Sequence, residues 1–263
     1  MSLIKSTKGP RVLLYDIESS LMPVAVFELI HNDYISPENI LAERHLICAA
    51  WKWSDETKIH SVSLLDDPKR FKRDIHDDRH VVETLHTIMS EADVLVGHNS
   101  DSFDKRYIDT RILKLGLPAL PPITSLDTYK TAKSRLLCAS NKLDYLAQFL
   151  GVGKKMKTSH GLWLRVMQGD KEAIKEMEKY NKVDVEILEK VFLKLRPYMS
   201  NYVNRELYGA GVECPRCGSS DIQSRGTHKA VSRVYQRYQC QECGGWFKLQ
   251  KADAGTTTKY RVL

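Results

Sequence analysis

Residues 11–20 read Arg-Val-Leu-Leu-Tyr-Asp-Ile-Glu-Ser-Ser, an apolar run that ends in two carboxylates. Because side chains alternate between the faces of a strand, a strand here places Asp16 and Glu18 on one face with Val12 and Leu14. Two neighbouring carboxylates repel each other unless a cation neutralises them, and their hard oxygen atoms suit Mg²⁺ or Mn²⁺. The alternative is a solvated strand end that carries two acids by chance, and this stretch alone leaves both interpretations open.

The composition is that of a folded protein. A chain of 263 residues has room for one sizeable domain and a small module, and 42% hydrophobic with 28% charged residues excludes wholesale disorder. Residues 1–10 lack the apolar core of a signal peptide, and no apolar run reaches the roughly 18 residues of a membrane span. We therefore expect a cytoplasmic protein with no membrane partner.

The positive charge is concentrated near the C-terminus. The formal net charge is +7, and residues 211–263 contain nine Lys or Arg against four Asp or Glu, which leaves only +2 for the first 210 residues. A basic balance favours a polyanionic partner such as nucleic acid.

The apolar pattern predicts an α/β domain built on a mixed sheet flanked by helices. Three strands are expected first, at residues 11–20, 44–53 and 57–65. Further strands are expected at 92–97 and ending at Asp127, with helices at 81–89, 103–115, 129–138, 141–150, 161–168 and 170–195. Residues 66–80 are strongly charged and are expected to form a surface loop, with a phosphate contact as the alternative.

The chain is expected to divide into three parts. Pro197 ends the helical pattern, and residues 197–212 have the composition of a linker. We therefore assign residues 1–205 to the α/β domain, 206–250 to a small second module and 251–263 to a flexible tail.

Three more polar residues of the α/β domain suit the same chemistry. Asp104 ends the stretch 97–104 at a strand-to-helix junction, where open sheets place their sites, although the helix dipole alone also explains an acid there. Tyr180 and Asp184 are four residues apart in a predicted helix, so they share one face and can point at one centre. A core tyrosine and a surface acid are the ordinary alternatives.

These residues occur as three ordered motifs, Asp16-x-Glu18, Asn99-x3-Phe103-Asp104 and Tyr180-x3-Asp184. With them the chain resembles the DEDD superfamily of ribonuclease-H-like 3′–5′ exonucleases. The tyrosine places it in the DEDDy subgroup, which includes the proofreading domains of family-B DNA polymerases. The resemblance covers about residues 10–197.

Two further stretches refine this resemblance. Residues 140–146 are similar to free-standing, often phage-associated members of the subgroup, which implies a bacterial or phage-infected host cytosol. The histidine-bearing subgroup would have His where this chain has Lys179. His98 and His160 are therefore predicted to be structural or substrate-contacting rather than catalytic.

The resemblance implies hydrolysis by a two-metal-ion mechanism. Asp16, Glu18 and Asp184 would hold one Mg²⁺ or Mn²⁺, and Asp16 would bridge to a second ion that Asp104 supports directly or through water. Tyr180 would orient the attacking water and assist its deprotonation.

The resemblance also implies where nucleic acid, DNA in preference to RNA, would bind. Asn99 and Phe103 match positions that meet the terminal nucleotides, with Phe103 stacking on a base. An equal alternative for Phe103 is an apolar anchor of the helix core.

The six cysteines are of two kinds. Four occur as Cys214-x2-Cys217 and Cys240-x2-Cys243, each pair followed by glycine, and these resemble the two knuckles of a zinc ribbon that holds one Zn²⁺. A redox pair is the alternative. The remaining two are expected to be small buried hydrophobes, Cys48 and Cys138.

The stretch between the knuckles combines basic and aromatic residues. Arg233, Tyr235 and Arg237 alternate along a predicted strand, and Trp246 follows on its partner. Such side chains bind single-stranded nucleic acid by charge and stacking, although some aromatics must instead fill the small core of the module. A replication or repair protein is a second partner that this module could engage.

The prediction is therefore a metal-dependent 3′–5′ exonuclease with a zinc ribbon that aids nucleic-acid binding. One rival is a structure-selective endonuclease that uses the same carboxylates. Another is a non-catalytic nucleic-acid-binding or scaffold protein, against which the complete acidic set argues.

Overall fold

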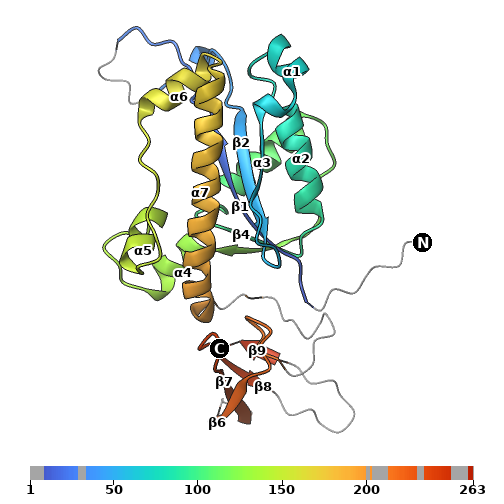
Figure 1. Ribbon diagram of the computed structural model, residues 1–263, viewed down its shortest axis with the longest axis vertical. Helices are drawn as coiled ribbons and strands as arrows, with labels where there is room; N and C mark the ends of the chain where they lie inside the picture. The colour runs from blue at the N-terminus through green and yellow to red at the C-terminus, as the bar shows by residue number, and fades with distance from the viewer. Residues whose placement is uncertain are drawn as a thin grey trace, which may run out of the picture.

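The structure is a computed structural model that describes residues 9–28, 34–199, 202, 213–229, 234–249 and 260–262, the last three and Leu249 as backbone only. A five-stranded mixed sheet carries helices on both faces, and a four-stranded antiparallel sheet forms a C-terminal module (Figure 1). The expected α/β class with a small C-terminal β module is confirmed.

Strand β1 is the centre of the larger sheet, whose order is β3-β2-β1-β4-β5. It pairs antiparallel with β2 and parallel with β4, and β4 pairs parallel with β5. The carboxyl ends of β1, β4 and β5 therefore meet at one edge, where ligand sites of such sheets form. The strands span Val12–Ser19 (β1), Leu46–Trp53 (β2), His60–Ser63 (β3), Val94–Gly97 (β4) and Thr124–Asp127 (β5).

Helices cover both faces of this sheet (Figure 1). The α-helices span Pro68–Arg73 (α1), Arg79–Ser90 (α2), Asp104–Lys114 (α3), Thr128–Arg135 (α4), Leu143–Phe149 (α5), His160–Met167 (α6) and Lys171–Leu195 (α7). Short 3-10 helices span Pro37–Asn39 (η1), Leu64–Asp66 (η2) and Arg196–Tyr198 (η3).

The alternation of β1 decides which residues meet which helices. Leu13 packs in a core with α2 and α3, whereas Val12 and Leu14 pack in a second core with Leu188 and Val191 of α7. Asp16 and Glu18 follow Val12 and Leu14 at intervals of two, so they share the face that α7 covers. The predicted alternation therefore brings the two acids under the long helix.

Helix α7 has a capped N-terminus and one apolar face. The Asp170 carboxylate accepts hydrogen bonds from the backbone N–H groups of Glu172 and Ala173, at 2.9 and 3.2 Å, and so caps the helix. Its buried positions recur every three or four residues, and Tyr180 and Asp184 are among them.

The prediction of a surface loop at residues 66–80 is wrong for its first half. Asp67 accepts a hydrogen bond from the Arg70 backbone N–H at 3.0 Å, and Pro68 occupies the first turn of the resulting helix α1. An N-cap aspartate followed by proline starts helices, and burial of Phe71 stabilises this one. Helix α1 has many charged residues and buries only Phe71, so its sequence shows no helical hydrophobic pattern.

The C-terminal module is a meander of order β6-β7-β8-β9. Its strands span Ile222–Lys229 (β6), Val234–Cys240 (β7), Trp246–Leu249 (β8) and Tyr260–Val262 (β9). Within the expected tail at 251–263, residues 260–262 pair with β8. The predicted boundary at 205/206 falls outside the described residues.

No helix among the described residues is long and apolar enough to cross a membrane.

Candidate active site

Three carboxylates converge between β1 and α7. Oxygen atoms of Asp16, Glu18 and Asp184 lie within 4.8 Å of one another. Asp184 is buried, and its Oδ1 has no hydrogen-bond partner in the described part of the chain. A buried carboxylate oxygen without a donor is costly, and the hard oxygen atoms of the three side chains suit a divalent cation.

Asp104 lies beside this trio rather than within it. It occupies the first turn of α3, where it is 7% exposed. Burial raises the pKa of its carboxyl and the Ile17 backbone N–H lowers it in part, so Asp104 lies near β1 between Asp16 and Glu18.

Burial raises the pKa of all four acids, and the charges of neighbouring site acids add to this for Asp16 and Glu18. Burial raises the pKa of Glu18 to about 8, with a further contribution from the Asp184 charge. Burial likewise raises the pKa of Asp104 to about 6, and burial with the charges of Asp104 and Asp184 raises that of Asp16 well above its usual range. The pKa of Asp184 is also raised by burial. Such a cluster needs positive charge to be ionised near neutral pH.

Lys155 supplies part of that charge, and the sequence analysis assigned it no role. Its Nζ lies 2.5 Å from Asp184 Oδ2 and 5.2 Å from the centroid of the Tyr180 ring. Its backbone N–H donates to Asp144 Oδ1 at 2.7 Å, which fixes the loop before α6. Burial lowers the pKa of Lys155, but the neighbouring carboxylates outweigh that effect and raise it.

Asn181 is the second residue that the sequence analysis missed. It is fully buried, and its Nδ2 donates to Asp16 Oδ2 at 2.6 Å. Its position three residues before Asp184 places it on the same helix face, so the spacing contained the signal.

The ring and the hydroxyl of Tyr180 have different surroundings. The ring is 8% exposed and meets the Trp163 ring edge-on, with centroids 6.5 Å apart. Burial raises the pKa of the phenol, and the neighbouring Asp184 charge raises it further. The burial of the ring fits a core aromatic, and the role of Tyr180 as a site residue stays a prediction.

Asn99 and Phe103 lie at the rim of the same edge. Asn99 has φ +61° and donates its backbone N–H to Asp127 Oδ1 at 2.9 Å. Phe103 is 38% exposed and stacks on Tyr107, with centroids 5.9 Å apart. At this exposure Phe103 is not a buried core anchor, and its stacking on a base stays a prediction.

Neither His98 nor His160 belongs to the group of three carboxylates. His98 Nδ1 lies 2.9 Å from Thr128 Oγ1, and His160 is an exposed residue at the start of α6. Burial lowers the pKa of His98 to about 4, so this ring is neutral at physiological pH.

Four thiols converge in the C-terminal module. The Sγ atoms of its cysteines lie within 4.8 Å of one another, with Cys214 to Cys243 at 3.6 Å and Cys217 to Cys240 at 3.5 Å, and none forms a disulfide. Four sulfur ligands at this separation fit a tetrahedral Zn²⁺. Cys48 is buried as predicted, whereas Cys138 is only partly buried.

The predicted nucleic-acid contacts of the module have different surroundings. The guanidinium of Arg237 lies 5.5 Å from the Trp246 ring, which is 38% exposed, so these two form an accessible pair. Tyr235 is only 8% exposed, so the prediction that it stacks on a base is corrected. Arg233 lies outside the described residues.

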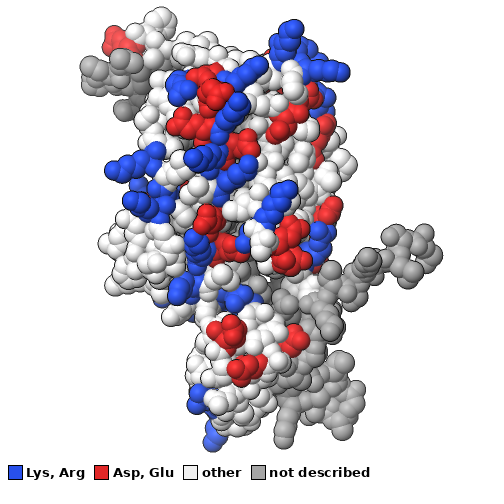
Figure 2. Space-filling model, in the orientation of Figure 1, with Lys and Arg blue, Asp and Glu red and all other residues white. Residues whose placement is uncertain are grey.

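The charge on the described part of the module is mixed. Figure 2 shows acidic side chains beside basic ones on its visible face, and residues 213–229 and 234–249 hold five Lys or Arg against three Asp or Glu. Part of the basic excess predicted for the C-terminus therefore belongs to residues that the structure does not describe.

Comparisons with known proteins agree with this architecture. The chain is similar in structure to the family B DNA polymerase from the hyperthermophilic archaeon Pyrobaculum calidifontis, with a TM-score of 0.50 and 17% identity over 85% of this chain. The match spans 31% of that polymerase chain, and at 17% identity it shows the fold alone. No curated protein sequence matches the chain.

A family profile gives the assignment. The RNase_H_2 profile, described as RNase_H superfamily, matches residues 54–196, which are more than half of the 263 residues. That range contains α7 with Asp184, Tyr180 and the Lys155 loop. The chain therefore belongs to the RNase H superfamily.

Proposed function

We propose that this protein is a metal-dependent 3′–5′ exonuclease that hydrolyses nucleic acid, with DNA favoured. The observation that carries the proposal is the convergence of three carboxylates with a buried, unpartnered Asp184 oxygen at the ligand-binding edge of an RNase H-like sheet. Such an arrangement suits phosphodiester hydrolysis, because phosphate oxygens and carboxylates share divalent cations.

Asp16, Glu18 and Asp184 would hold Mg²⁺ or Mn²⁺, and Asp104 would support a second ion at Asp16. The fit rests on the hard oxygen donors and on the raised pKa values of the four acids. When bound, two such ions stabilise the attacking and leaving oxygens of a displacement at phosphorus.

The chain's own residues would orient the reactants. Asn181 holds Asp16 through a hydrogen bond of 2.6 Å, and the Tyr180 hydroxyl would orient the attacking water. The exposed Phe103 ring would stack on a terminal base, and Asn99 lies four residues before it.

The C-terminal module would hold one structural Zn²⁺ through Cys214, Cys217, Cys240 and Cys243. Its accessible Arg237 and Trp246 pair would bind nucleic acid by charge and stacking. A replication or repair protein docking on the module is the alternative use of this surface.

The test uses labelled DNA and RNA, single-stranded and duplex, with Mg²⁺ or Mn²⁺. A 5′-labelled strand is expected to shorten by one nucleotide at a time, whereas a 3′-labelled strand should release labelled mononucleotide from the first turnover. Circular single-stranded DNA should remain intact. Linearisation of the circle would identify an endonuclease, and no hydrolysis of any substrate would favour a binding or scaffold role.

A further inference from the structure

An open groove lies between α1 and the first turns of α7. It has a volume of about 560 Å³, within the range of sites that bind small ligands or peptide side chains. Its lining residues are Leu65, Pro68, Phe71, Lys72, Ile75, Lys171 and Lys175. None of them belongs to the catalytic site described above.

The floor of the groove is aliphatic and continuous with the protein core. Phe71 is 8% exposed, and Leu65 and Ile75 are partly buried against the core beneath α2. A floor that already packs against the core does not have to form when a partner binds, so little ordering entropy opposes binding.

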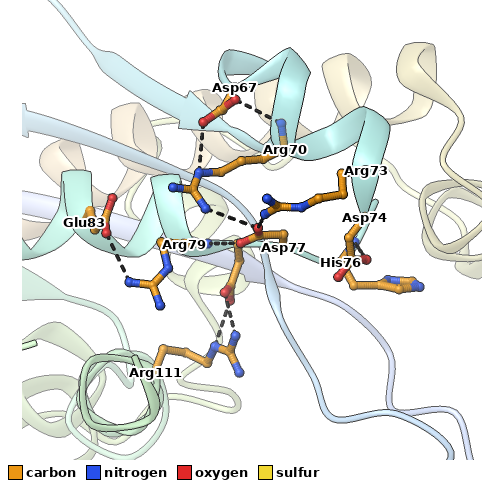
Figure 3. Close-up of polar contacts among 10 residues, drawn as sticks. Asp67, Arg70, Arg73, Asp74, His76, Asp77, Arg79, Glu83 and Arg111 are labelled. Carbon is orange, nitrogen blue, oxygen red and sulfur yellow. Dashed lines mark hydrogen bonds and ion pairs between the residues drawn. The ribbon is translucent and has the colours of Figure 1, made fainter. Parts of the chain in front are cut away.

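The wall formed by α1 is held by an ion-pair network (Figure 3). Arg70 and Arg73 both reach Asp77 Oδ2, at 3.3 and 2.7 Å, and Arg70 Nε also lies 3.0 Å from Asp67 Oδ2. Next along the chain, the buried Asp78 pairs with Arg111 of α3 at 2.5 Å. These contacts fix α1 to the body of the domain, so the groove is preformed.

The rim of the groove is positive. Lys171 and Lys175 are one helical turn apart on α7, Lys72 stands on α1, and all three are exposed. Lys175 pairs with Glu172 at 2.8 Å, whereas no ion pair within the described part of the chain involves Lys72 or Lys171. Figure 2 shows Lys and Arg side chains gathered over α1.

We propose that this groove docks a short acidic protein segment that carries one or two apolar side chains. The apolar side chains would enter the floor at Phe71 and Ile75, and the flanking carboxylates would meet the lysine rim. Charge complementarity selects the occupant, because no carboxylate lines the described groove. Single-stranded nucleic acid fits less well, since it requires exposed aromatic rings for stacking and Phe71 is buried.

The test is a selection from a random peptide library displayed against the full-length protein. Enriched peptides should carry net negative charge with at least one Leu, Phe or Ile. Their affinity, measured by fluorescence anisotropy with a labelled enriched peptide, should fall by about tenfold or more in Lys171→Glu/Lys175→Glu. Affinity should also fall as salt is added.

A matched control exists on the same helix. Lys190 and Lys194 have the same spacing, and Lys190 pairs with Glu186 at 2.7 Å, as Lys175 pairs with Glu172. Lys190→Glu/Lys194→Glu should therefore leave peptide affinity unchanged, and both double variants should keep the wild-type circular dichroism spectrum.

Three outcomes would overturn the proposal. The selection could yield no acidic apolar consensus, or consensus peptides could bind both double variants equally well. Alternatively, poly(dT) could displace the peptide and lose its own affinity in Lys171→Glu/Lys175→Glu but not in the control. That last result would reassign the groove to nucleic acid.

Discussion

Lys155 places an ammonium group where the carboxylates need a cation, with Nζ 2.5 Å from Asp184 Oδ2. A divalent ion at Asp184 must displace this contact or share the carboxylate with it. In the proposed function, lysine and metal would therefore compete for one ligand, and the lysine would lower the apparent affinity of the site for the metal.

Lys155→Met keeps the length of the side chain and removes its charge. We expect this variant to bind Mn²⁺ about tenfold more tightly, equivalent to about 1.4 kcal/mol, in a calorimetric titration without nucleic acid. Lys154→Met, one residue away and exposed, is the control and should not change the affinity. Unchanged or weaker Mn²⁺ binding by Lys155→Met would show that the two cations do not compete.

The raised pKa of Glu18 gives the protein a pH-dependent stability. A carboxyl group whose pKa rises on folding stabilises the fold fully below its ordinary value near 4.5, and that contribution is lost as pH rises towards about 8. The melting temperature of protein dialysed free of Mg²⁺ and Mn²⁺ should therefore fall between about pH 5 and about pH 8.

Added Mg²⁺ should flatten this fall, because the cation stabilises the ionised form. Glu18→Gln should flatten it without Mg²⁺, whereas Glu176→Gln, at an exposed position of α7, should not. An equally steep fall in Glu18→Gln and wild type would exclude Glu18 as the source.

The acidic residues could be predicted from sequence, and Lys155 could not. Strand alternation places Asp16 and Glu18 on one face, and α7 presents Tyr180 and Asp184 from one side, so local geometry alone aligns them. Lys155 reaches Asp184 only because an irregular loop folds back over α7. Nothing in the local pattern of a loop specifies such a contact.

Among the elements, α1 shows how charge can mislead a prediction from sequence. Its six residues are mostly basic, so hydrophobic periodicity gives no signal, and the decisive features are the Asp67 cap and the Pro68 start. The long, strongly periodic elements, β1, β2 and α7, were predicted within a few residues of their observed bounds. Short helices such as α1 are specified by single capping residues, and hydrophobic periodicity does not detect these.

The four-thiol cluster is expected to hold zinc and to stabilise the C-terminal module. Its apolar core is small, with Phe247 fully buried beside Cys214 and Cys240, so a bound metal would contribute much of the stability. Elemental analysis of protein purified without chelator should find one Zn²⁺ per chain, and Cys240→Ser should lose it. A disulfide between these cysteines in reducing buffer, or no zinc, would contradict this expectation.

At the scale of the whole molecule, Arg216 joins the module to the α/β domain. This guanidinium is 2% exposed and donates from Nη1 to the Trp246 carbonyl at 2.5 Å and from Nε to the Met199 carbonyl at 3.3 Å. Met199 directly follows η3 at the end of α7. Arg216 therefore links the module that contains the four thiols to the end of the helix that carries Asp184.

In the proposed function, the carboxylates hydrolyse the nucleic acid and the C-terminal module contributes part of its binding. Each phosphate contact on single strands contributes about −0.7 to the slope of log affinity against log salt. Arg237→Ala should therefore flatten that slope by about 0.7 for a DNA oligonucleotide, measured with Ca²⁺ in place of Mg²⁺. Lys194→Ala, on α7, should leave the slope unchanged, and equal slopes in both variants would exclude Arg237 as a phosphate contact.

The central claim is that the carboxylates between β1 and α7 hold the cations that hydrolyse nucleic acid. The most direct test compares single-turnover cleavage of 5′-labelled single-stranded DNA by wild type and Asp184→Asn at saturating Mg²⁺. The amide keeps the size of the side chain but loses its charge, so we predict a loss of at least about 10³-fold in rate with the DNA affinity retained. A cleavage rate for Asp184→Asn equal to that of the wild type would contradict the account.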